Sequence, residues 1–332
     1  MTLRQTTTRG VIAVALCLAL PPVHAQSPAW RPERAVEFIV PAAAGGLNDL
    51  TMRNMQRVMQ SLKLIDVPIT INNKGGGGGA LAWATLAQHP GDSHYISIST
   101  VNMLANPIMG VGTAHYRDFT PLGHLVHSYL GFAVKADSPI RNGQDLIERL
   151  KQDPGALSIS IGTSPGNPSH VALLQVTGPA GIESRRLKTL VFKSNGESIA
   201  ALLGGHVDVA ISGLPNLAKH VESKALRVIA VTSPARLPGI LANVPTWREQ
   251  GADVTVSGWR GALGPAKMPP AQIAFWEDAI GKLVDSPEWD HVLAKDFATR
   301  ARMSAAENLA FLDQEYTRYQ AVLTELGLAK AK

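Results

Sequence analysis

The chain has 332 residues, of which 45% are hydrophobic and 17% charged, and its formal net charge is +5. This composition is typical of a globular protein with a large core and excludes a disordered chain. The basic residues are dispersed and do not alternate with aromatic residues, so the sequence does not predict nucleic-acid binding. At roughly 150 residues per domain, the length predicts two domains.

Residues 1–25 have the order of a secretory signal peptide. Arg4 and Arg9 precede an apolar run at 11–20, and small residues follow up to Ala25. The run is much shorter than the roughly 20 residues that cross a bilayer, so we expect a cleaved leader and a soluble, periplasmic mature chain. A lipid anchor at Cys17 is the alternative, but the residue before it is not small. Cys17 is the only cysteine, which excludes thiolate chemistry and cysteine-ligated zinc from the mature chain.

Strand and helix patterns alternate along the first part of the mature chain. This alternation predicts an α/β sheet with mostly parallel strands. Met52, Met55, Met59 and Leu62 recur at helical spacing and form an apolar stripe that we assign to the core. The expected strands are 35–40, 68–72 and 95–100, and the expected helices are 49–62 and 79–88.

A second alternation follows residue 121, and the chain then returns to the first unit. We expect domain 1 to comprise 26–125 and 253–332, with domain 2 at 126–252 between them. The C-terminal helices, with Trp276 and Ile280 on one face, are expected to pack on the first unit. The expected strands are 130–134, 156–162, 189–192, 207–212, 226–232 and 254–263, and the expected helices are 142–152, 169–178, 197–203, 216–223, 270–284 and 305–326.

The first strand ends in a turn of small residues, PAAAGGLND at 41–49. Glycines let the backbone approach a ligand, and the following helix start presents unpaired N–H groups at the positive end of its dipole. The turn is therefore a candidate anion site built from main chain. The alternative is a tight turn in which Asn48 or Asp49 caps the helix.

The second turn contains five consecutive glycines at 75–79. Gly75, Gly77 and Ala80 fit the dinucleotide pattern G-x-G-x-x-A, but no acidic residue ends the next strand, where Asn102 follows Thr100. No Gly-Lys-Ser/Thr follows the glycines either, so a phosphate-binding loop is also excluded. We do not expect a nucleotide at this turn.

Two polar turns follow in the second unit, at 161–170 and 192–198. Thr163, Ser164 and Asn167 can donate hydrogen bonds to carboxylate oxygens, and a neutral His170 can donate or accept one. The alternative is a polar loop in which Ser169 caps the next helix. Ser194 repeats the pattern in the second of these turns.

The sequence contains no recognisable catalytic constellation. The histidines lack metal-ligand spacing, and no serine lies in a nucleophile elbow. Asp208 is either a buried polar residue at a strand end or a group of the cleft. A hydrolase or lyase using His170 or Asp49 as base is the enzyme alternative, but it lacks a nucleophile and an orienting partner. We expect no catalytic residues, no metal and no cofactor.

Several motifs together resemble the Bug-type periplasmic solute receptors, the binding components of tripartite tricarboxylate transport systems. They run in order along nearly the whole mature chain: the turn at 41–49, the glycines at 75–79, HPGDSHY at 89–95, YRDFTPL at 116–122, DSPI at 137–140, GNPSH at 166–170, LLGGHVDV at 202–209, LRVIAVTSPAR at 226–236, VPTWREQG at 244–251 and GWRGALGP at 258–265.

The resemblance implies a two-domain α/β periplasmic binding protein of the Venus-flytrap, type II-like class. It also implies a small di- or tricarboxylate ligand in the cleft, no cofactor, a monomer, and delivery to a membrane permease. A sensor that docks on a membrane signalling protein is an alternative with the same ligand chemistry. Ala42, Asn48 and the stretch 192–194 depart from the family pattern, which leaves the identity of the carboxylate open.

The candidate ligand-binding residues lie on the turns of both units, just after the third strand, and at the end of the strand 207–212. In the resembling family, the turns that map to 43–49 and 163–170 hold the carboxylates through backbone amides and water. The candidates are Ala43, Ala44, Gly45, Gly46, Asn48, Asp49, Asn102, Thr163, Ser164, Asn167, His170, Ser194 and Ser212.

Overall fold

The computed structural model describes residues 30–162, 165–192 and 194–330, so the predicted leader, Thr163 and Ser164 lie outside the described residues. The strands are β1 (Val36–Val40), β2 (Ile69–Asn73), β3 (Tyr95–Thr100), β4 (Thr120–Lys135), β5 (Ser158–Ser160), β6 (Lys188–Leu190), β7 (Val209–Gly213), β8 (Leu226–Val231), β9 (Ser257–Gly264) and β10 (Ala298–Arg300). The α-helices are α1 (Leu47–Ser61), α2 (Ala80–Leu86), α3 (Val101–Met109), α4 (Gly143–Gln152), α5 (Pro168–Thr177), α6 (Asn195–Leu203), α7 (Leu214–Glu222), α8 (Pro270–Val284), α9 (Pro287–Lys295) and α10 (Ala305–Glu325).

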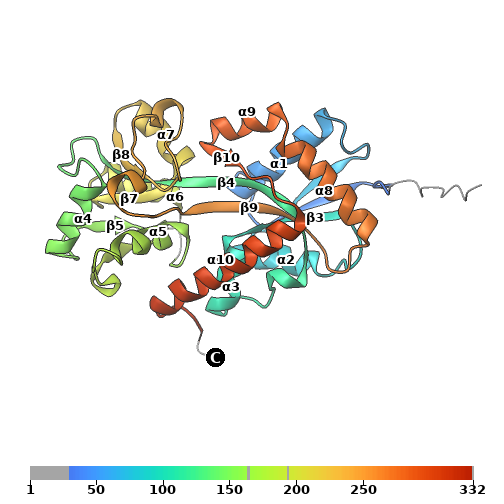
Figure 1. Ribbon diagram of the computed structural model, residues 1–332, viewed down its shortest axis with the longest axis horizontal. Coiled ribbons are helices and arrows are strands. Elements are labelled where there is room, and N and C mark those ends of the chain that lie inside the picture. The colour runs from blue at the N-terminus through green and yellow to red at the C-terminus, as the bar shows by residue number, and fades with distance from the viewer. Residues whose placement is uncertain (1–29, 163–164, 193, 331–332) are drawn as a thin grey trace, which may run out of the picture.

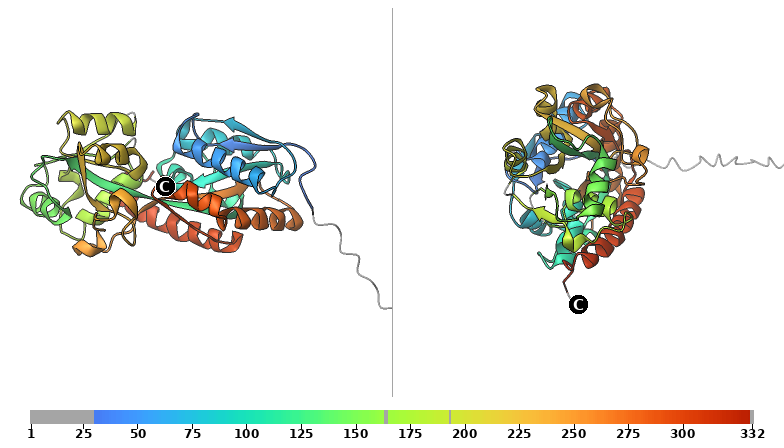
Figure 2. Two further views of the ribbon diagram at one scale, coloured as in Figure 1. Left: turned by 90° about the horizontal axis from the view of Figure 1, so that it is seen from above. Right: turned by 90° about the vertical axis from the view of Figure 1, so that its left-hand side faces the viewer.

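The molecule is elongated and has two lobes, joined by the long strands β4 and β9 (Figure 1; Figure 2). The first lobe contains β1–β3 with α1–α3 and α8–α10, and the second contains β5–β8 with α4–α7. One sheet passes through both lobes in the order β2-β1-β3-β9-β4-β7-β5-β6, and β8 and β10 also pair with β4. The predicted boundary after residue 125 falls inside β4, and the predicted boundary after residue 252 falls shortly before β9; both boundaries stay predictions.

The prediction of a mostly parallel sheet is wrong, because the sheet is mixed. Within each lobe the pairs β1–β2, β1–β3, β5–β6 and β5–β7 are parallel, as βαβ crossovers require. All pairings of β4 and β9 are antiparallel. The two long strands run in opposite directions between the lobes, so they join two parallel sets into one mixed sheet.

The predicted apolar stripe of α1 lies in the core. Met52, Met55 and Met59 are fully buried and pack in one cluster with β1, β3 and α8. The same cluster contains Trp276 and Ile280, so the prediction that the C-terminal helices return to the first lobe is confirmed. A second cluster continues through both lobes along β4, β9 and α10. The lobes therefore share part of their core.

Most predicted helices and strands occur within a few residues of their expected ends, with three main differences. The strand expected at 130–134 is the 16-residue β4, which begins at Thr120. The sequence patterns do not predict α3, which contains Pro107, or the short α9, which begins at Pro287. Proline lacks an N–H and normally ends a helix, which is why the pattern at 101–109 does not read as helical.

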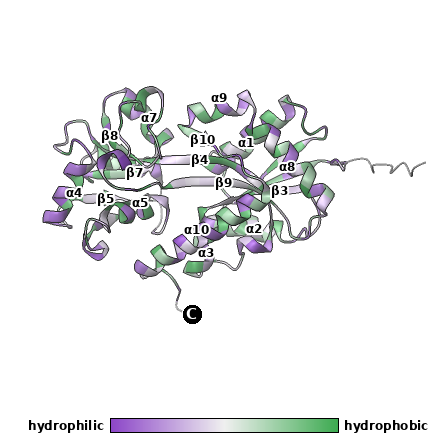
Figure 3. Cartoon of the chain, in the orientation of Figure 1, coloured by the Kyte–Doolittle hydropathy of each residue, from purple (hydrophilic) through white to green (hydrophobic). Residues whose placement is uncertain are grey.

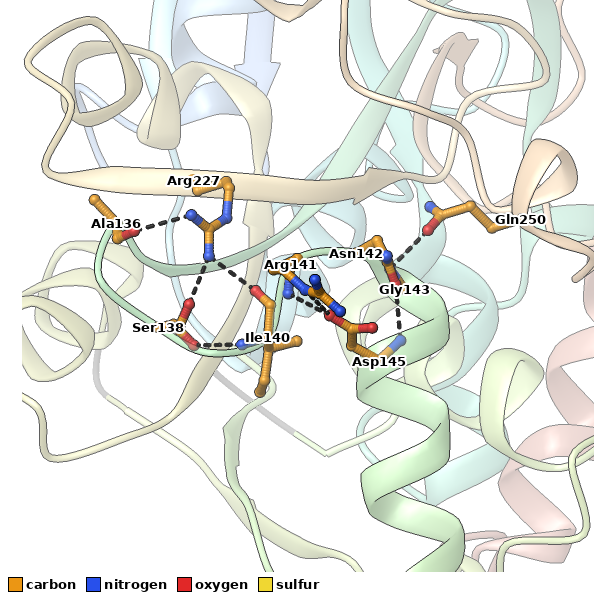
Figure 4. Close-up of polar contacts among 9 residues, drawn as sticks. All are labelled: Ala136, Ser138, Ile140, Arg141, Asn142, Gly143, Asp145, Arg227 and Gln250. Carbon is orange, nitrogen blue, oxygen red and sulfur yellow. Dashed lines mark hydrogen bonds and ion pairs between the residues drawn. The ribbon is translucent and has the colours of Figure 1, made fainter.

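The far end of β4 is fixed by Arg227 of β8. Its guanidinium donates hydrogen bonds to the carbonyl oxygens of Ala136, Ser138 and Ile140 in the loop that follows β4 (Figure 4). Asn142 then caps α4 by accepting the Asp145 N–H. These contacts fix the C-terminal end of β4 within the second lobe.

Candidate functional site

The register of β4 brings the ends of both parallel strand sets to its middle. Thr100, the last residue of β3, lies opposite Arg260 of β9, which lies opposite Val126 of β4. Gly213, the last residue of β7, lies opposite Leu130 of β4. Four residues of strand span roughly 13 Å. The carboxyl ends of the two lobes' strands therefore face each other at the position where open α/β sheets bind ligands.

The middle of this crossing contains small and polar residues. Ser128 of β4 pairs with Gly258 of β9, between the two strand ends. Both strands are pale in the hydropathy view where they cross between the lobes, whereas green helix faces pack inside each lobe (Figure 3). The crossing therefore suits a polar ligand better than an apolar one.

The first-lobe turn presents backbone. Ala43, Ala44 and Gly45 are exposed, and Gly45 has a φ of 79°, which favours glycine. Gly46 is the N-cap of α1 and has no side chain that could cap the first turn. The alternative that Asn48 or Asp49 caps this helix is wrong. The N–H groups at the start of α1 therefore lack a capping side chain, and they follow directly on an exposed turn.

Asp49 lies beneath this turn and is 1% exposed. Its carboxylate accepts hydrogen bonds from Gly45 N (2.8 Å), Arg53 Nε (3.0 Å) and Asn73 Nδ2 (2.9 Å). Burial by itself would raise the pKa of Asp49, but the hydrogen bonds from Arg53, Gly45 and Asn73 lower it overall. The carboxylate is ionised and saturated by donors, so it shapes the turn and is unsuited to act as a base.

The glycine cluster packs against this turn. A Cβ at Gly75 would lie 2.9 Å from Ala43 N, and a Cβ at Gly79 would lie 2.8 Å from the Trp83 ring. Close packing therefore explains the glycines without a nucleotide. Asn102 occupies the first turn of α3, whose N-cap Thr100 makes no side-chain capping hydrogen bond. A Cβ at Gly78 would lie 3.5 Å from Asn102 Nδ2, so Asn102 and the glycine cluster adjoin.

The second-lobe turn is closed by its own side chains. Asn167 is the N-cap of α5: its Oδ1 accepts the His170 N–H (3.0 Å), and its Nδ2 donates to Ile161 O (2.8 Å). The alternative that Ser169 caps this helix is wrong. His170 Nδ1 lies 3.1 Å from Gly166 N, and burial lowers the pKa of His170 to about 4. His170 is therefore neutral near pH 7 and accepts the Gly166 N–H.

The same turn reaches the first lobe. A Cβ at Gly166 would lie 2.5 Å from Leu323 Cδ2 of α10 and 3.5 Å from Met109 Sδ at the end of α3. Gly166 has a φ of 72°. Only glycine combines this conformation with so close an approach, so Gly166 keeps the second-lobe turn against the first lobe.

The remaining second-lobe candidates differ in their surroundings. Ser194 is exposed and caps α6 by accepting the Glu197 N–H at 3.1 Å. Ser212, near the carboxyl end of β7, is 1% exposed, and its Oγ has no hydrogen-bond partner in the described part of the chain. Asp208 lies at the opposite end of β7, is exposed, and accepts hydrogen bonds from Ser158 N and Oγ. Asp208 therefore fixes strand register outside the candidate site.

Arg260 of β9 lies at the crossing of the lobes, and the sequence patterns do not identify it as a site residue. It is 5% exposed, and its Nε donates to Asn48 Oδ1 (3.1 Å) and its Nη1 to Ser128 Oγ (3.0 Å). Burial lowers the pKa of Arg260 to about 10, so the guanidinium stays charged near neutral pH. The available signal is a charged residue in the otherwise apolar strand GWRGALG.

Two further kinds of site can be assessed over the described ranges. Among residues 30–162, 165–192 and 194–330, no group of three or more histidine, cysteine, aspartate or glutamate side chains could hold a metal ion. In the same ranges no helix is long and apolar enough to span a membrane. The described site contains main chain, neutral polar groups, the inward-facing carboxylate of Asp49 and the guanidinium of Arg260.

Comparison with known proteins identifies the fold and the family. Residues 52–328 match the model of the tripartite tricarboxylate transporter family receptor. A Cupriavidus necator protein named for the gbd 5' region is 27% identical over 330 residues, with 97% of each chain covered. Protein BugT of Bordetella pertussis is 25% identical over 308 residues, with 91% of each chain covered.

Two solved structures from Rhodopseudomonas palustris have the same fold. A protein solved with adipate has a TM-score of 0.77 at 22% identity and covers 90% of this chain and 99% of its own. MatC, solved with bound malate, has a TM-score of 0.71 at 22% identity and covers 88% of this chain and 99% of its own. The predicted two-domain periplasmic binding fold is confirmed. The chain belongs to the tripartite tricarboxylate transporter receptor family of periplasmic solute-binding proteins, as its Bug-type motifs predict.

Proposed function

We propose that this receptor binds a small di- or tricarboxylate between its lobes, without chemical conversion, and delivers it to the membrane permease of a tripartite transport system. The observation that carries the proposal is the register of β4, because it brings the carboxyl ends of β3 and β7 to one crossing, where Arg260 contacts Asn48 in the uncapped first turn of α1. The malate and adipate in the two related structures have the same ligand chemistry.

The proposed grip on the first carboxylate is the turn at 43–46. Its backbone is exposed, and the dipole of α1 favours negative charge at this end by about 0.3–1 kcal/mol at an exposed site and more where water is excluded. Asp49 keeps its own carboxylate turned into the protein, where it is saturated by Gly45, Arg53 and Asn73. Gly45 N is used by Asp49 and Gly46 N by Ala43 O. The donors proposed for an external anion are therefore the N–H groups without a described partner in this turn and in the first turn of α1.

The proposed role of the second lobe is to close over the ligand. Asn167, His170, Ser194 and Ser212, together with Thr163 and Ser164, are the proposed neutral contacts. Closure is favoured by contacts that form only when both lobes reach the same ligand. Domain boundaries after residues 125 and 252 are also proposed, because the first falls within β4 and the second shortly before β9, the two strands that cross between the lobes.

The test is a thermal-shift screen followed by calorimetry. Mature protein is exposed to mono-, di- and tricarboxylates, with malate and adipate included, because a ligand of the native state raises the apparent Tm with the logarithm of its saturation. We expect one saturable event with a 1:1 stoichiometry and an unchanged ligand after recovery. If no carboxylate shifts the Tm at millimolar concentration, or if the ligand is converted to product, the proposal is wrong.

Delivery needs a separate experiment. Reconstituted permease in liposomes should take up the bound carboxylate only when this receptor is present. Docking on a sensor kinase without uptake would instead support the signalling alternative.

A further inference from the structure

Arg260 is an enclosed cation at the crossing of the lobes. It lies on β9, opposite the end of β3 and opposite Val126 of β4, and is 5% exposed. Asn48, which accepts its Nε–H, lies in the first turn of α1, directly after the proposed carboxylate-binding turn. The guanidinium is thus in contact with the first-lobe half of the proposed site.

The charge of Arg260 has no direct counter-ion in the described part of the chain. Its two hydrogen bonds go to neutral oxygens, Asn48 Oδ1 and Ser128 Oγ, and no described carboxylate lies within 4.0 Å of it. Asp296 attracts the guanidinium at longer range: burial raises the pKa of Asp296 overall, and the charge of Arg260 opposes this shift. An enclosed charge without an ion pair destabilises a fold, so a purely structural strand residue would be better apolar.

The remaining donors of Arg260 suit a second carboxylate. A guanidinium has five N–H donors, and the two described hydrogen bonds use one on Nε and one on Nη1. Nη2 makes no hydrogen bond among the described residues, so its donors and the second Nη1 donor remain. Ser128 and Asn48 hold the group in one orientation, which favours a two-point bond to a planar carboxylate.

We propose that Arg260 is the specificity-determining residue that selects ligands with two carboxylates over ligands with one. The first carboxylate takes the unpaired backbone donors of the turn at 43–46 and of the first turn of α1, and the second pairs with the guanidinium. Asn48 and Ser128 are positioning residues for Arg260. This inference rests on the proposed carboxylate-binding function, which it deepens by separating the contacts of the two carboxylates.

The experiment compares matched ligands on matched variants by calorimetry. Adipate is paired with hexanoate and succinate with butyrate, so each pair differs by one carboxylate. We expect Arg260→Met to weaken dicarboxylate binding about 100-fold and monocarboxylate binding less than threefold, because only one ligand class loses a buried charge pair. Arg260→Lys should weaken dicarboxylates about tenfold, since it keeps the charge but loses the two-point geometry. Arg31→Met is the control, because Arg31 is an exposed arginine that pairs with Asp66 and lies before β1, away from the crossing.

The outcomes separate this inference from the proposed function. If the wild type binds no carboxylate, the proposed function fails and the inference falls with it. If the wild type binds a dicarboxylate and Arg260→Met binds it within threefold, only the inference is wrong. A lowered Tm of unliganded Arg260→Met, with equal losses for both ligand classes, would show a structural role and also overturn it. An unchanged or higher Tm with loss confined to dicarboxylates supports it.

Discussion

The two lobes begin their helices differently at the crossing. In the first lobe, α1 and α3 start at Gly46 and Thr100 without a side-chain capping hydrogen bond. In the second lobe, Asn167 and Ser194 cap α5 and α6, and the first residue of α5 is Pro168, which has no N–H. The second-lobe helix α7 also starts without a side-chain cap, at Gly213. Uncapped helix starts therefore occur in both lobes, but side-chain caps are confined to α5 and α6 of the second lobe among these five helices.

In our proposal, the two lobes therefore have different roles in binding the ligand. Unsatisfied amides and a positive helix end attract an anion before closure, so the first lobe is expected to capture the ligand. The second lobe has neutral groups such as the imidazole of His170, so it contributes fewer donors and mainly excludes water. Substitutions in the first-lobe turn should thus reduce affinity more than equivalent substitutions in the second lobe.

The largest effect is expected for Gly46→Leu. The φ of Gly46 is −75°, which any residue can adopt. A Cβ there would lie 3.3 Å from Ala43 O, so the turn must shift by a few tenths of an ångström to admit a side chain, which then obstructs it. We expect carboxylate affinity to fall at least 100-fold, with the Tm of the unliganded protein nearly unchanged. Calorimetry and thermal unfolding measure the two quantities.

The matched control is Gly155→Leu in the second lobe, where a Cβ would meet no atom closer than 3.5 Å. It should leave affinity unchanged. If Gly46→Leu binds as the wild type does, the first-lobe turn is not the carboxylate site.

The next effect concerns the residue that shapes the first turn. Asp49→Asn removes the charge that holds Gly45 N, Arg53 and Asn73, and we expect a loss of about 2 kcal/mol of stability at pH 7 and about tenfold in affinity. The folded-state pKa of Asp49 is lowered, so its contribution is complete above about pH 4 and is lost as the pH falls through the folded pKa. Urea unfolding of the two proteins should therefore converge in strong acid.

Asp145→Asn is the matched control for affinity. Asp145 also accepts a backbone N–H and an arginine, Arg141, but it lies at the start of α4 away from the crossing. A similar loss of affinity in both variants would contradict a specific role for Asp49.

The second-lobe turn should respond to a different pH range. Burial lowers the pKa of His170 to about 4, below its ordinary 6.5, so the unfolded chain takes up this proton first as the pH falls. His170 therefore destabilises the fold progressively from about pH 6.5 down to about pH 4, by about 2 kcal/mol at pH 5. In His170→Gln, the decrease of unfolding free energy between pH 7 and pH 5 should be smaller by that amount. An unchanged slope would show that His170 is not the titrating group.

Much of this architecture could be predicted because its signals are local. Met52, Met55 and Met59 mark the core face of α1 by spacing alone, and the glycines at 45–46 mark the open turn. The caps were harder to assign, because Gly46 has no polar side chain to signal a cap and Asn167 competes with Ser169. Competing cap residues differ by little free energy, and packing decides between them.

The non-local features could not be predicted from patterns. The extent of β4 depends on pairing with β9, β7, β8 and β10, all distant in sequence. Arg260 can be recognised as a site residue only from its contacts with Asn48 and Ser128, which lie 212 and 132 residues away in the sequence. A single charged residue in an apolar strand does not reveal which partners the fold brings to it.

The smallest effect is expected for Ser212→Ala, which tests whether the second lobe touches the ligand through β7. Ser212 Oγ is buried and has no partner among the described residues, so removing it should leave stability unchanged or raise it by less than about 1 kcal/mol. If the hydroxyl bonds the ligand on closure, affinity should fall about three- to tenfold. Ser97→Ala is the contrast, because Ser97 Oγ already donates to Ile39 O at 2.6 Å and its loss should reduce stability by about 1 kcal/mol without changing affinity. Equal affinity in wild type and Ser212→Ala would show that Ser212 does not contact the ligand.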